Sequence, residues 1–249
     1  VRVNVPYEEM PVPDFLTRTA AKYPERDAIL FMNARIKYAE YKDHADRMAT
    51  ALTELGVKKG DKVAIHSPTI PQAAIAFQAA SALGAVVVLT NPLYTPREIK
   101  HQWNDAEVKI AITMDFLWDQ KVRGMRDELT AEKFIICSIP EYLKFPLNLL
   151  APIKLKKADP PLYAKIGDEA EVYKFKDLIK SSAATPPTVE IAMDDLAVLQ
   201  YTGGTTGVSK GAMLTHRNLS VNVQQINEWF SNVERGEEVV MGCLPIFHV

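Results

Sequence analysis

Apolar residues recur along the chain with two alternating periods. Tyr41, Ala45, Met48, Leu52 and Leu55 are separated by steps of four and three residues, which is the spacing of one face of a helix. Short apolar runs between such stretches are typical of buried strands. In chain order, the pattern predicts a helix over 41–55, strand 62–66, helix 71–83, strand 85–89, a helix opening at 95, strand 109–113, helix 116–129 and strand 134–137. This alternation predicts an α/β fold with mainly parallel sheets covered by helices, in a layered αβα sandwich.

The longest uncharged stretch lies at 73–89 and covers 17 residues. A membrane-spanning helix needs about 20 predominantly apolar residues. Here Gln78, Ser81 and Gly84 interrupt the run. We therefore expect a buried helix followed by a buried strand, both inside a water-soluble domain.

The middle of the chain interrupts the alternation. Residues 140–161 hold five prolines and few helix signals, and the polar segment 181–188 is typical of a surface loop. Order returns further on, where the pattern predicts strand 196–201, strand 211–215, helix 216–230 and a last strand at 238–244.

Composition narrows the class of protein. Apolar residues make up 47% of the 249 positions and charged residues 24%, and 29 Lys and Arg against 31 Asp and Glu give a net charge of −2. This mix is typical of a globular protein, and it lacks the basic excess of a nucleic-acid-binding protein. Two cysteines, Cys137 and Cys243, cannot form a disulfide scaffold, so we expect a reducing, cytoplasmic location. No His, Cys and Asp cluster has the spacing of a zinc site, and we assign no metal ligand.

The segment 201–211 concentrates residues that bind phosphate. It contains four glycines, three threonines, one serine and Lys210 in eleven positions. Glycine lets backbone N–H groups approach an anion closely, threonine hydroxyls add donors, and the lysine adds a compact positive charge. The spacing is that of neither the usual P-loop nor the dinucleotide-binding motif. The alternative is a flexible surface turn without a ligand.

The same segment resembles a known signature. Tyr201-Thr-Gly-Gly-Thr-Thr-Gly-Val-Ser-Lys-Gly211 is similar to Tyr-Thr-Ser-Gly-Thr-Thr-Gly-x-Pro-Lys-Gly of the adenylate-forming superfamily, with Gly203 in place of Ser and Ser209 in place of Pro. Its form is most similar to that of long-chain fatty-acid–CoA ligases. Segments 36–63, 84–98 and 244–248 resemble further conserved blocks of this family, in the family's order.

The resemblance implies an activity and a set of site residues. It implies ATP-dependent activation of a fatty acid to an acyl-adenylate and then to acyl-CoA, with Mg²⁺, release of pyrophosphate and release of AMP. Lys210 and His248 are then the expected catalytic residues. The expected phosphate-binding residues are Thr202, Gly203, Gly204, Thr205, Thr206, Gly207 and Lys210. His248 without this context would be an ordinary histidine at a strand end, and we interpret His44, His66, His101 and His216 as structural.

The resemblance also bears on domain organisation. The chain begins at Val1 rather than Met, and family members are about twice as long, so we expect residues 1–249 to be an incomplete N-terminal AMP-binding domain. The remainder of the large domain and the small C-terminal domain would lie outside the chain, and this part alone would be inactive. Two alternatives remain: another branch of the superfamily that acts on short, aryl or amino acids, and a non-catalytic nucleotide-binding fragment.

Two surface contacts are also expected. Segment 142–157 mixes eight large apolar residues with four lysines and no acid, which suits peripheral contact with the inner membrane face. The alternative is that these apolar residues pack on the protein itself and the lysines are solvated. The last strand would leave apolar surface uncovered, which favours a homo-oligomer.

Overall fold

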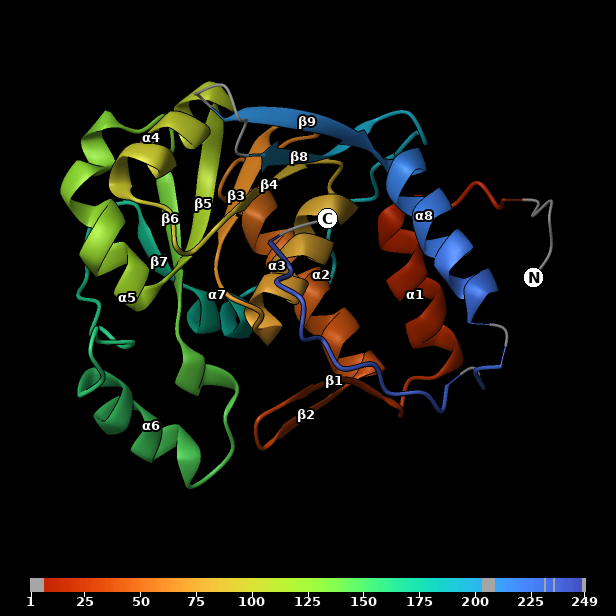
Figure 1. Cartoon of the computed structure of the whole chain (residues 1–249), viewed down its shortest axis with the longest axis horizontal. Helices are drawn as coiled ribbons and strands as arrows, with labels where there is room; N and C mark the ends of the chain where they lie inside the picture. Colours follow the sequence, from red (N-terminus) through yellow and green to blue (C-terminus); the bar gives the residue numbers. More distant parts are fainter. Residues whose placement is uncertain (1–6, 203–208, 231, 235, 248–249) are drawn as a thin grey trace.

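A seven-stranded sheet forms the centre of the molecule (Figure 1). The computed structural model describes residues 7–202, 209–230, 232–234 and 236–247. In order across the sheet, the strands are β7 (Val172–Lys174), β6 (Lys133–Cys137), β5 (Val108–Met114), β3 (Lys62–His66), β4 (Val86–Thr90), β8 (Leu196–Thr202) and β9 (Lys210–Thr215). All neighbouring pairs are parallel except β8 and β9, which are antiparallel. The predicted α/β fold with a mainly parallel sheet is confirmed.

Helices cover both faces of this sheet, and each face has its own apolar core. On one face lie α1 (Val12–Lys22), α2 (Tyr38–Glu54), α3 (Pro71–Ala82) and α7 (Phe175–Ser181); on the other lie α4 (Pro96–Asp105) and the helical segment that starts with α5 (Asp115–Leu117). Side chains alternate between the faces of a strand. Val63 and Ile65 of β3 accordingly pack toward α2 and α3, whereas Ala64 between them packs toward Trp103 of α4. This is the layered sandwich that the apolar pattern predicts.

Three elements lie outside these layers. Strands β1 (Asp27–Phe31) and β2 (Ala34–Lys37) form a separate antiparallel hairpin. Helix α8 (His216–Trp229) follows β9 and packs on α1. Helix α6 (Leu147–Lys156) follows the short 3-10 turn η3 (Ile139–Tyr142) and projects from the molecule next to the hairpin (Figure 1).

The uncharged stretch 73–89 is divided between α3 and β4, as predicted, and β4 is buried along its whole length. No described helix is both long and apolar enough to cross a lipid bilayer. Helix α3 packs against the sheet, α1 and α2. A helix that is enclosed in this way is apolar on all sides.

The predicted start of α4 is confirmed in detail. The Thr95 hydroxyl accepts a hydrogen bond from the Glu98 backbone N–H, and the Glu98 carboxylate accepts one from the Thr95 N–H, so both halves of the capping box are present. Ile99, Trp103 and Ala106 are buried, as their spacing predicts.

Three element predictions need correction. No strand is present over 238–244; Val239, Val240 and Met241 are largely exposed there, because no described strand lies alongside them for pairing. The predicted helix 116–129 is not continuous: α5 passes into a π-helical turn, η1 (Trp118–Val122), and a 3-10 helix, η2 (Arg123–Glu128).

The third correction concerns the proline-rich middle. Residues 140–161 contain α6, and this helix runs through Pro152. A proline in a helix removes one backbone hydrogen bond, at a typical cost of about 3 kcal/mol. None of the residues of α6 is buried, so water can satisfy the carbonyl group that loses its partner.

Candidate functional site

The glycine- and threonine-rich loop joins two paired strands of the sheet. Strand β8 ends at Thr202 and β9 begins at Lys210, and these two residues are partners across the antiparallel ladder. Both side chains are exposed, at the two ends of the loop. The other predicted phosphate-binding residues, Gly203, Gly204, Thr205, Thr206 and Gly207, lie outside the described residues. The structure therefore places the ends of the predicted site together and leaves its middle as a prediction.

The positive charge at this position is available to a ligand. Among the described residues, Lys210 takes part in no ion pair and no side-chain hydrogen bond. An exposed, unpaired ammonium group at the end of a loop rich in backbone N–H groups suits a polyphosphate. Next to it, Gly211 faces the ring of Tyr201: a Cβ atom at position 211 would lie 3.0 Å from the Cε2 atom of that ring. A side chain at this position would require the buried tyrosine ring to shift by a few tenths of an ångström.

Helix α4 holds both ends of the loop. The Tyr201 hydroxyl, just before the loop, donates a 2.5 Å hydrogen bond to the Asp105 carboxylate. The His101 Nε2 atom lies 3.2 Å from the carbonyl oxygen of Ser209, just after the loop, and its N–H donates to that oxygen. Burial, followed by the contact with Asp105, raises the pKa of Tyr201, so the hydroxyl stays protonated and remains a donor.

Sequence reasoning missed the role of His101 and Asp105. His101 was interpreted as structural, and Asp105 was not singled out. The two residues are four positions apart on one helix, so they share a face, but nothing in the sequence indicates that this face meets the loop.

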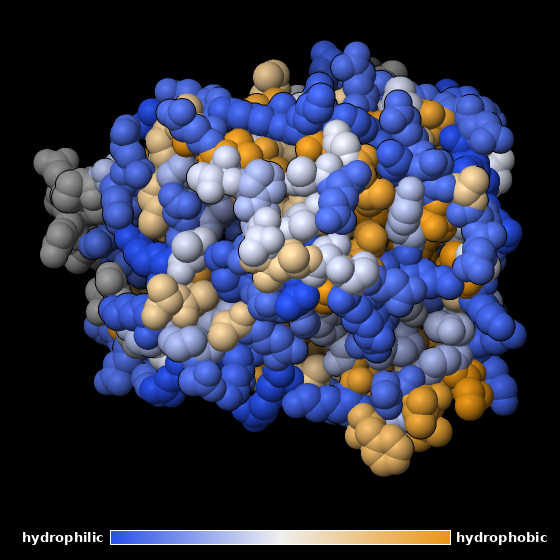
Figure 2. Space-filling model, turned by 180° about the vertical axis from the view of Figure 1, so that it is seen from behind, coloured by the Kyte–Doolittle hydropathy of each residue, from blue (hydrophilic) through white to orange (hydrophobic). Residues whose placement is uncertain are grey.

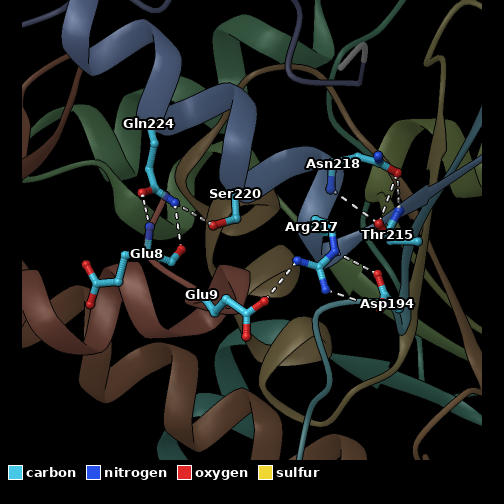
Figure 3. A network of polar contacts seen from close by, with 8 residues as sticks. All are labelled: Glu8, Glu9, Asp194, Thr215, Arg217, Asn218, Ser220 and Gln224. Atoms are coloured by element: carbon cyan, nitrogen blue, oxygen red, sulfur yellow. Dashed lines mark hydrogen bonds and ion pairs between the residues drawn. The ribbon is translucent and has the colours of Figure 1, made fainter. Parts of the chain in front are cut away.

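The helix after β9 is anchored at its first turn. Thr215 and Asn218 form a second capping box, in which each backbone N–H donates to the other's side-chain oxygen. The Arg217 guanidinium contacts Asp194, at 2.8 Å, and Glu9, at 3.1 Å (Figure 3). These contacts fix the end of β9 relative to the segment before β8 and to the N-terminal segment.

A second set of contacts extends this anchor along α8. The Gln224 side chain accepts a hydrogen bond from the Glu8 backbone N–H at 2.9 Å and donates one to the Glu8 carbonyl oxygen at 3.0 Å, and it also donates to the Ser220 hydroxyl (Figure 3). The β8–loop–β9–α8 unit is thus held on one side by α4 and on the other by the N-terminal segment.

The other predicted catalytic residue, His248, lies outside the described residues, but the segment that leads to it is described. The Gln200 side chain donates to the Phe247 carbonyl oxygen at 3.3 Å, and the Ile246 N–H donates to the Thr69 hydroxyl at 3.3 Å. This segment therefore lies at the carboxyl ends of β8 and β3. Ligands of open α/β sheets bind at such ends.

A cavity of about 330 Å³ lies beside this segment. Its lining is mainly apolar and includes Phe77, Leu89, Ile246 and Phe247. The lining suits a hydrocarbon group rather than a phosphate, since it carries no charged side chain.

The buried histidines have structural partners. His66, at the end of β3, lies with its Nδ1 atom 3.0 Å from the Thr113 hydroxyl, and burial lowers its pKa to about 3. His216 is also buried, and its Nδ1 atom accepts a hydrogen bond from the Val12 N–H. His44 pairs with the Tyr142 hydroxyl at 3.0 Å. These contacts agree with the structural interpretation of these three histidines.

Two carboxyl groups, at the carboxyl ends of β5 and β6, both accept hydrogen bonds from Ser138. The Ser138 hydroxyl donates to Asp115 at 2.8 Å, and the Ser138 N–H donates to Glu141 at 3.1 Å. Burial raises the pKa of Asp115 to about 6 and that of Glu141 to about 7. No group of three or more His, Cys, Asp or Glu side chains within the described part of the chain is placed to hold a metal ion.

Comparisons with known proteins identify the family of the chain. Residues 16–249 match the family of AMP-binding enzymes. A long-chain-fatty-acid–CoA ligase of Bacillus subtilis (strain 168) is 35% identical over 254 aligned positions, which cover 99% of this chain and 44% of the relative. A 4-coumarate–CoA ligase 1 of Solanum tuberosum is 29% identical, and the match covers 97% of this chain and 40% of that protein.

The fold has solved counterparts. The structure of a long-chain-fatty-acid-CoA ligase from Archaeoglobus fulgidus superposes with a TM-score of 0.75 at 21% identity, and the match covers 98% of this chain and 44% of that one. This chain therefore spans less than half the length of each of these three proteins. Because the family match extends over almost the whole chain and includes the loop between β8 and β9, the chain belongs to the family of AMP-binding enzymes.

Proposed function

We propose that this chain is the N-terminal part of an AMP-forming acid–thiol ligase that converts a fatty acid to its CoA thioester. The observation that carries the proposal is the loop between β8 and β9, with Thr202 and Lys210 exposed as partners at its two ends. The relatives named long-chain-fatty-acid–CoA ligase support the fatty acid as substrate. The remaining part of the large domain and a small C-terminal domain would complete the enzyme.

In the first step, a carboxylate oxygen of the fatty acid attacks the α-phosphorus of ATP. The bond from this phosphorus to the bridging oxygen breaks, and pyrophosphate leaves with the bonding electron pair. Negative charge therefore grows on the leaving group. The loop's backbone N–H groups, the hydroxyls of Thr202, Thr205 and Thr206, and the Lys210 ammonium group would stabilise that charge.

In the second step, the thiolate sulfur of CoA attacks the carbonyl carbon of the acyl-adenylate. AMP leaves with the electron pair of the broken acyl–phosphate bond, and the thiol proton passes to solvent or to a base. In the first step, the resemblance assigns His248 to orienting the carboxylate of the fatty acid. Gln200 and Thr69 hold the residues just before it at the carboxyl ends of the strands.

Mg²⁺ enters this proposal as the ion that accompanies the phosphates of ATP. Mg²⁺ is commonly bound by one or two carboxylates together with substrate phosphates. The threonine hydroxyls of the loop suit hydrogen bonding to the same phosphates, and we assign the ion no ligand within this chain.

A second branch of the family is the alternative. The 4-coumarate–CoA ligase of Solanum tuberosum covers almost the whole chain at an identity only a little lower than that of the bacterial relatives. An aromatic acid is therefore the competing substrate class, and a nucleotide-binding protein without catalysis is the third candidate.

Acid-dependent exchange of labelled pyrophosphate into ATP separates these candidates. The full-length protein, of which this chain is one part, is used in this and all later exchange assays, with a series of fatty acids of increasing length, with coumarate and benzoate, and with amino acids. We expect exchange with fatty acids and little exchange with the others. Exchange with the aromatic acids alone would favour the alternative branch, and nucleotide binding without any exchange would contradict an enzymatic function.

A further inference from the structure

A group of apolar side chains is exposed on and just before α6. Four of them are largely exposed: Phe145 (76%), Leu149 (64%), Leu150 (55%) and Ile153 (59%). After the half-turn that relates Figure 2 to Figure 1, α6 lies at the lower right, where Figure 2 shows orange side chains projecting from the molecule. Monomeric proteins rarely expose such a contiguous apolar group without a function.

The helix presents these side chains outward on one side. Ile153 follows Leu149 by four positions and Leu150 by three, so these three side chains project from one side of the helix. No residue of α6 is buried. Its contacts are mainly with η3, and the nearby Leu143 is the side chain that packs into the protein. The structure therefore contradicts the alternative in which all of the apolar side chains of this segment pack on the protein itself.

A segment distant in sequence extends the apolar area. Met32, in the turn between β1 and β2, is 73% exposed. The neighbouring Asn33 donates a hydrogen bond to the Lys144 carbonyl oxygen and accepts one from the Lys144 N–H, each 3.1 Å long. The hairpin and the start of the α6 segment are thus fastened together, with exposed apolar side chains on both.

Four lysines accompany these side chains. Lys144, Lys154, Lys156 and Lys157 are exposed, and none of them forms an ion pair within the described part of the chain. No acidic residue lies between 142 and 158. We call the four lysines together with Met32, Phe145, Leu149, Leu150 and Ile153 the α6 surface.

We propose that the α6 surface docks the protein on an anionic lipid surface. Apolar side chains that project from a surface helix can enter the boundary between head groups and acyl chains, and unpaired lysines around them attract anionic head groups. A second copy of the chain is a poorer occupant, because a twofold contact through this surface would bring four lysines against four lysines. This inference goes beyond the proposed catalysis and does not depend on it.

The test is co-sedimentation of the protein with vesicles of phosphatidylcholine alone and with vesicles that also contain phosphatidylglycerol. Two variants are compared with the wild type. In the first, Lys144, Lys154, Lys156 and Lys157 are each changed to Gln. In the second, Phe145, Leu149, Leu150 and Ile153 are each changed to Ser. All these positions are exposed, and thermal unfolding of each variant checks that the fold is retained.

Two control variants carry equal numbers of changes elsewhere. One changes the exposed Arg18, Lys22, Lys58 and Arg97 to Gln, and the other changes the exposed Met213, Val223, Ile226 and Trp229 to Ser. The controls separate loss of the α6 surface from a general loss of positive charge or of apolar surface.

We expect the wild type to bind anionic vesicles and to lose binding at high salt. The α6 lysine variant should bind them at least about tenfold more weakly, since it lacks the four positive charges that attract anionic head groups. The α6 apolar variant should bind weakly at any salt concentration, and both controls should bind like the wild type. Pyrophosphate exchange in vesicle-free buffer should be the same in the α6 lysine variant and the wild type.

Other outcomes would overturn the proposal. Absence of binding by the wild type would show that another part of the protein, or another partner, covers the α6 surface. Equal weakening in a control variant would show that binding depends on total charge or total apolar surface. Light scattering tests a second copy as the occupant. A wild-type mass that doubles as the concentration rises, with the α6 apolar variant remaining at the monomer mass, would identify a second copy of the chain on this surface.

Discussion

The Tyr201 hydroxyl donates a 2.5 Å hydrogen bond to the carboxylate of Asp105, the last residue of α4. This bond joins β8, the strand that enters the glycine- and threonine-rich loop, to the helix that follows β4 in the sequence. His101, one turn earlier on α4, contacts the residue at which the loop ends. The position of the loop therefore depends on a helix about 100 positions away in the chain.

Removal of the tyrosine hydroxyl tests this support. We expect Tyr201→Phe to lower the rate of acid-dependent pyrophosphate exchange and to raise the KM for ATP, because the bond to a carboxylate contributes about 1–2 kcal/mol. The KM for the acid should change little. Tyr173→Phe is the matched control, since the Tyr173 hydroxyl also bonds a carboxylate, that of Glu171, far from the loop. Equal effects in both variants would show that the Tyr201 bond has no special part in ATP binding.

His101 gives a second test at the other end of the loop. We expect His101→Ala to lower the rate of pyrophosphate exchange by about three- to tenfold, because one ordinary hydrogen bond is lost. His101→Gln keeps an N–H donor and should recover most of the rate. His44→Ala removes a histidine hydrogen bond on the opposite face of the sheet and should leave exchange unchanged. A His101→Gln variant as slow as His101→Ala would show that the imidazole acts in another way.

Gly211 is expected to tolerate no side chain. In Gly211→Ala, the new methyl group would press on the Tyr201 ring, which is buried and held by Asp105, so we expect a loss of about 1–2 kcal/mol in the free energy of unfolding. Gly124→Ala is the control, because a Cβ atom there would meet nothing within 4 Å. Denaturant unfolding measures both variants. A Gly211→Ala protein as stable as the control would mean that the ring can move aside.

The raised pKa of Glu141 predicts a pH-dependent stability. Burial raises this pKa from 4.5 to about 7 in the folded protein. The folded state therefore holds the proton more tightly than the unfolded state, and stability falls as pH rises between these two values. Glu141→Gln removes the charge and keeps an oxygen that can accept from Ser138 and Gln72.

We expect Glu141→Gln to be more stable than the wild type by about 1–3 kcal/mol near pH 8, and by little near pH 5. The measurement is denaturant unfolding at both pH values. Glu54→Gln, at an exposed position, is the control and should show no such difference. A gain of the same size at both pH values would contradict the raised pKa as its cause.

Much of the central sheet could be predicted from the sequence. The buried strands of a parallel sheet are short apolar runs, and β3 was predicted with its observed bounds. Thr95 and Glu98 specify the start of α4 through contacts within one turn, which a sequence pattern captures. The large aromatic side chains of Trp103 and Trp118, both in helical segments, are fully buried.

The failures share a physical origin in distant contacts. Val239, Val240 and Met241 have the composition of a strand, but a strand also needs a neighbour, and the sequence does not reveal whether one is present. Pro152 discourages a helix locally, yet α6 is exposed, so water can satisfy the carbonyl group one turn earlier that loses its N–H partner. In the candidate site, the loop was found from its composition, whereas the support from His101 and Asp105 was missed because it depends on how α4 packs against β8 and β9.

In the proposed reaction, the loop between β8 and β9 holds the phosphates of ATP and stabilises the leaving pyrophosphate. Acid-dependent pyrophosphate exchange by the full-length Lys210→Ala protein tests this role, compared with full-length Lys180→Ala, which changes an exposed position away from the loop. We expect Lys210→Ala to lose about 2–4 kcal/mol of transition-state stabilisation, roughly 30- to 1,000-fold in rate, with unchanged binding of the fatty acid and an unchanged control. A Lys210→Ala protein that exchanges pyrophosphate at the wild-type rate would contradict the account.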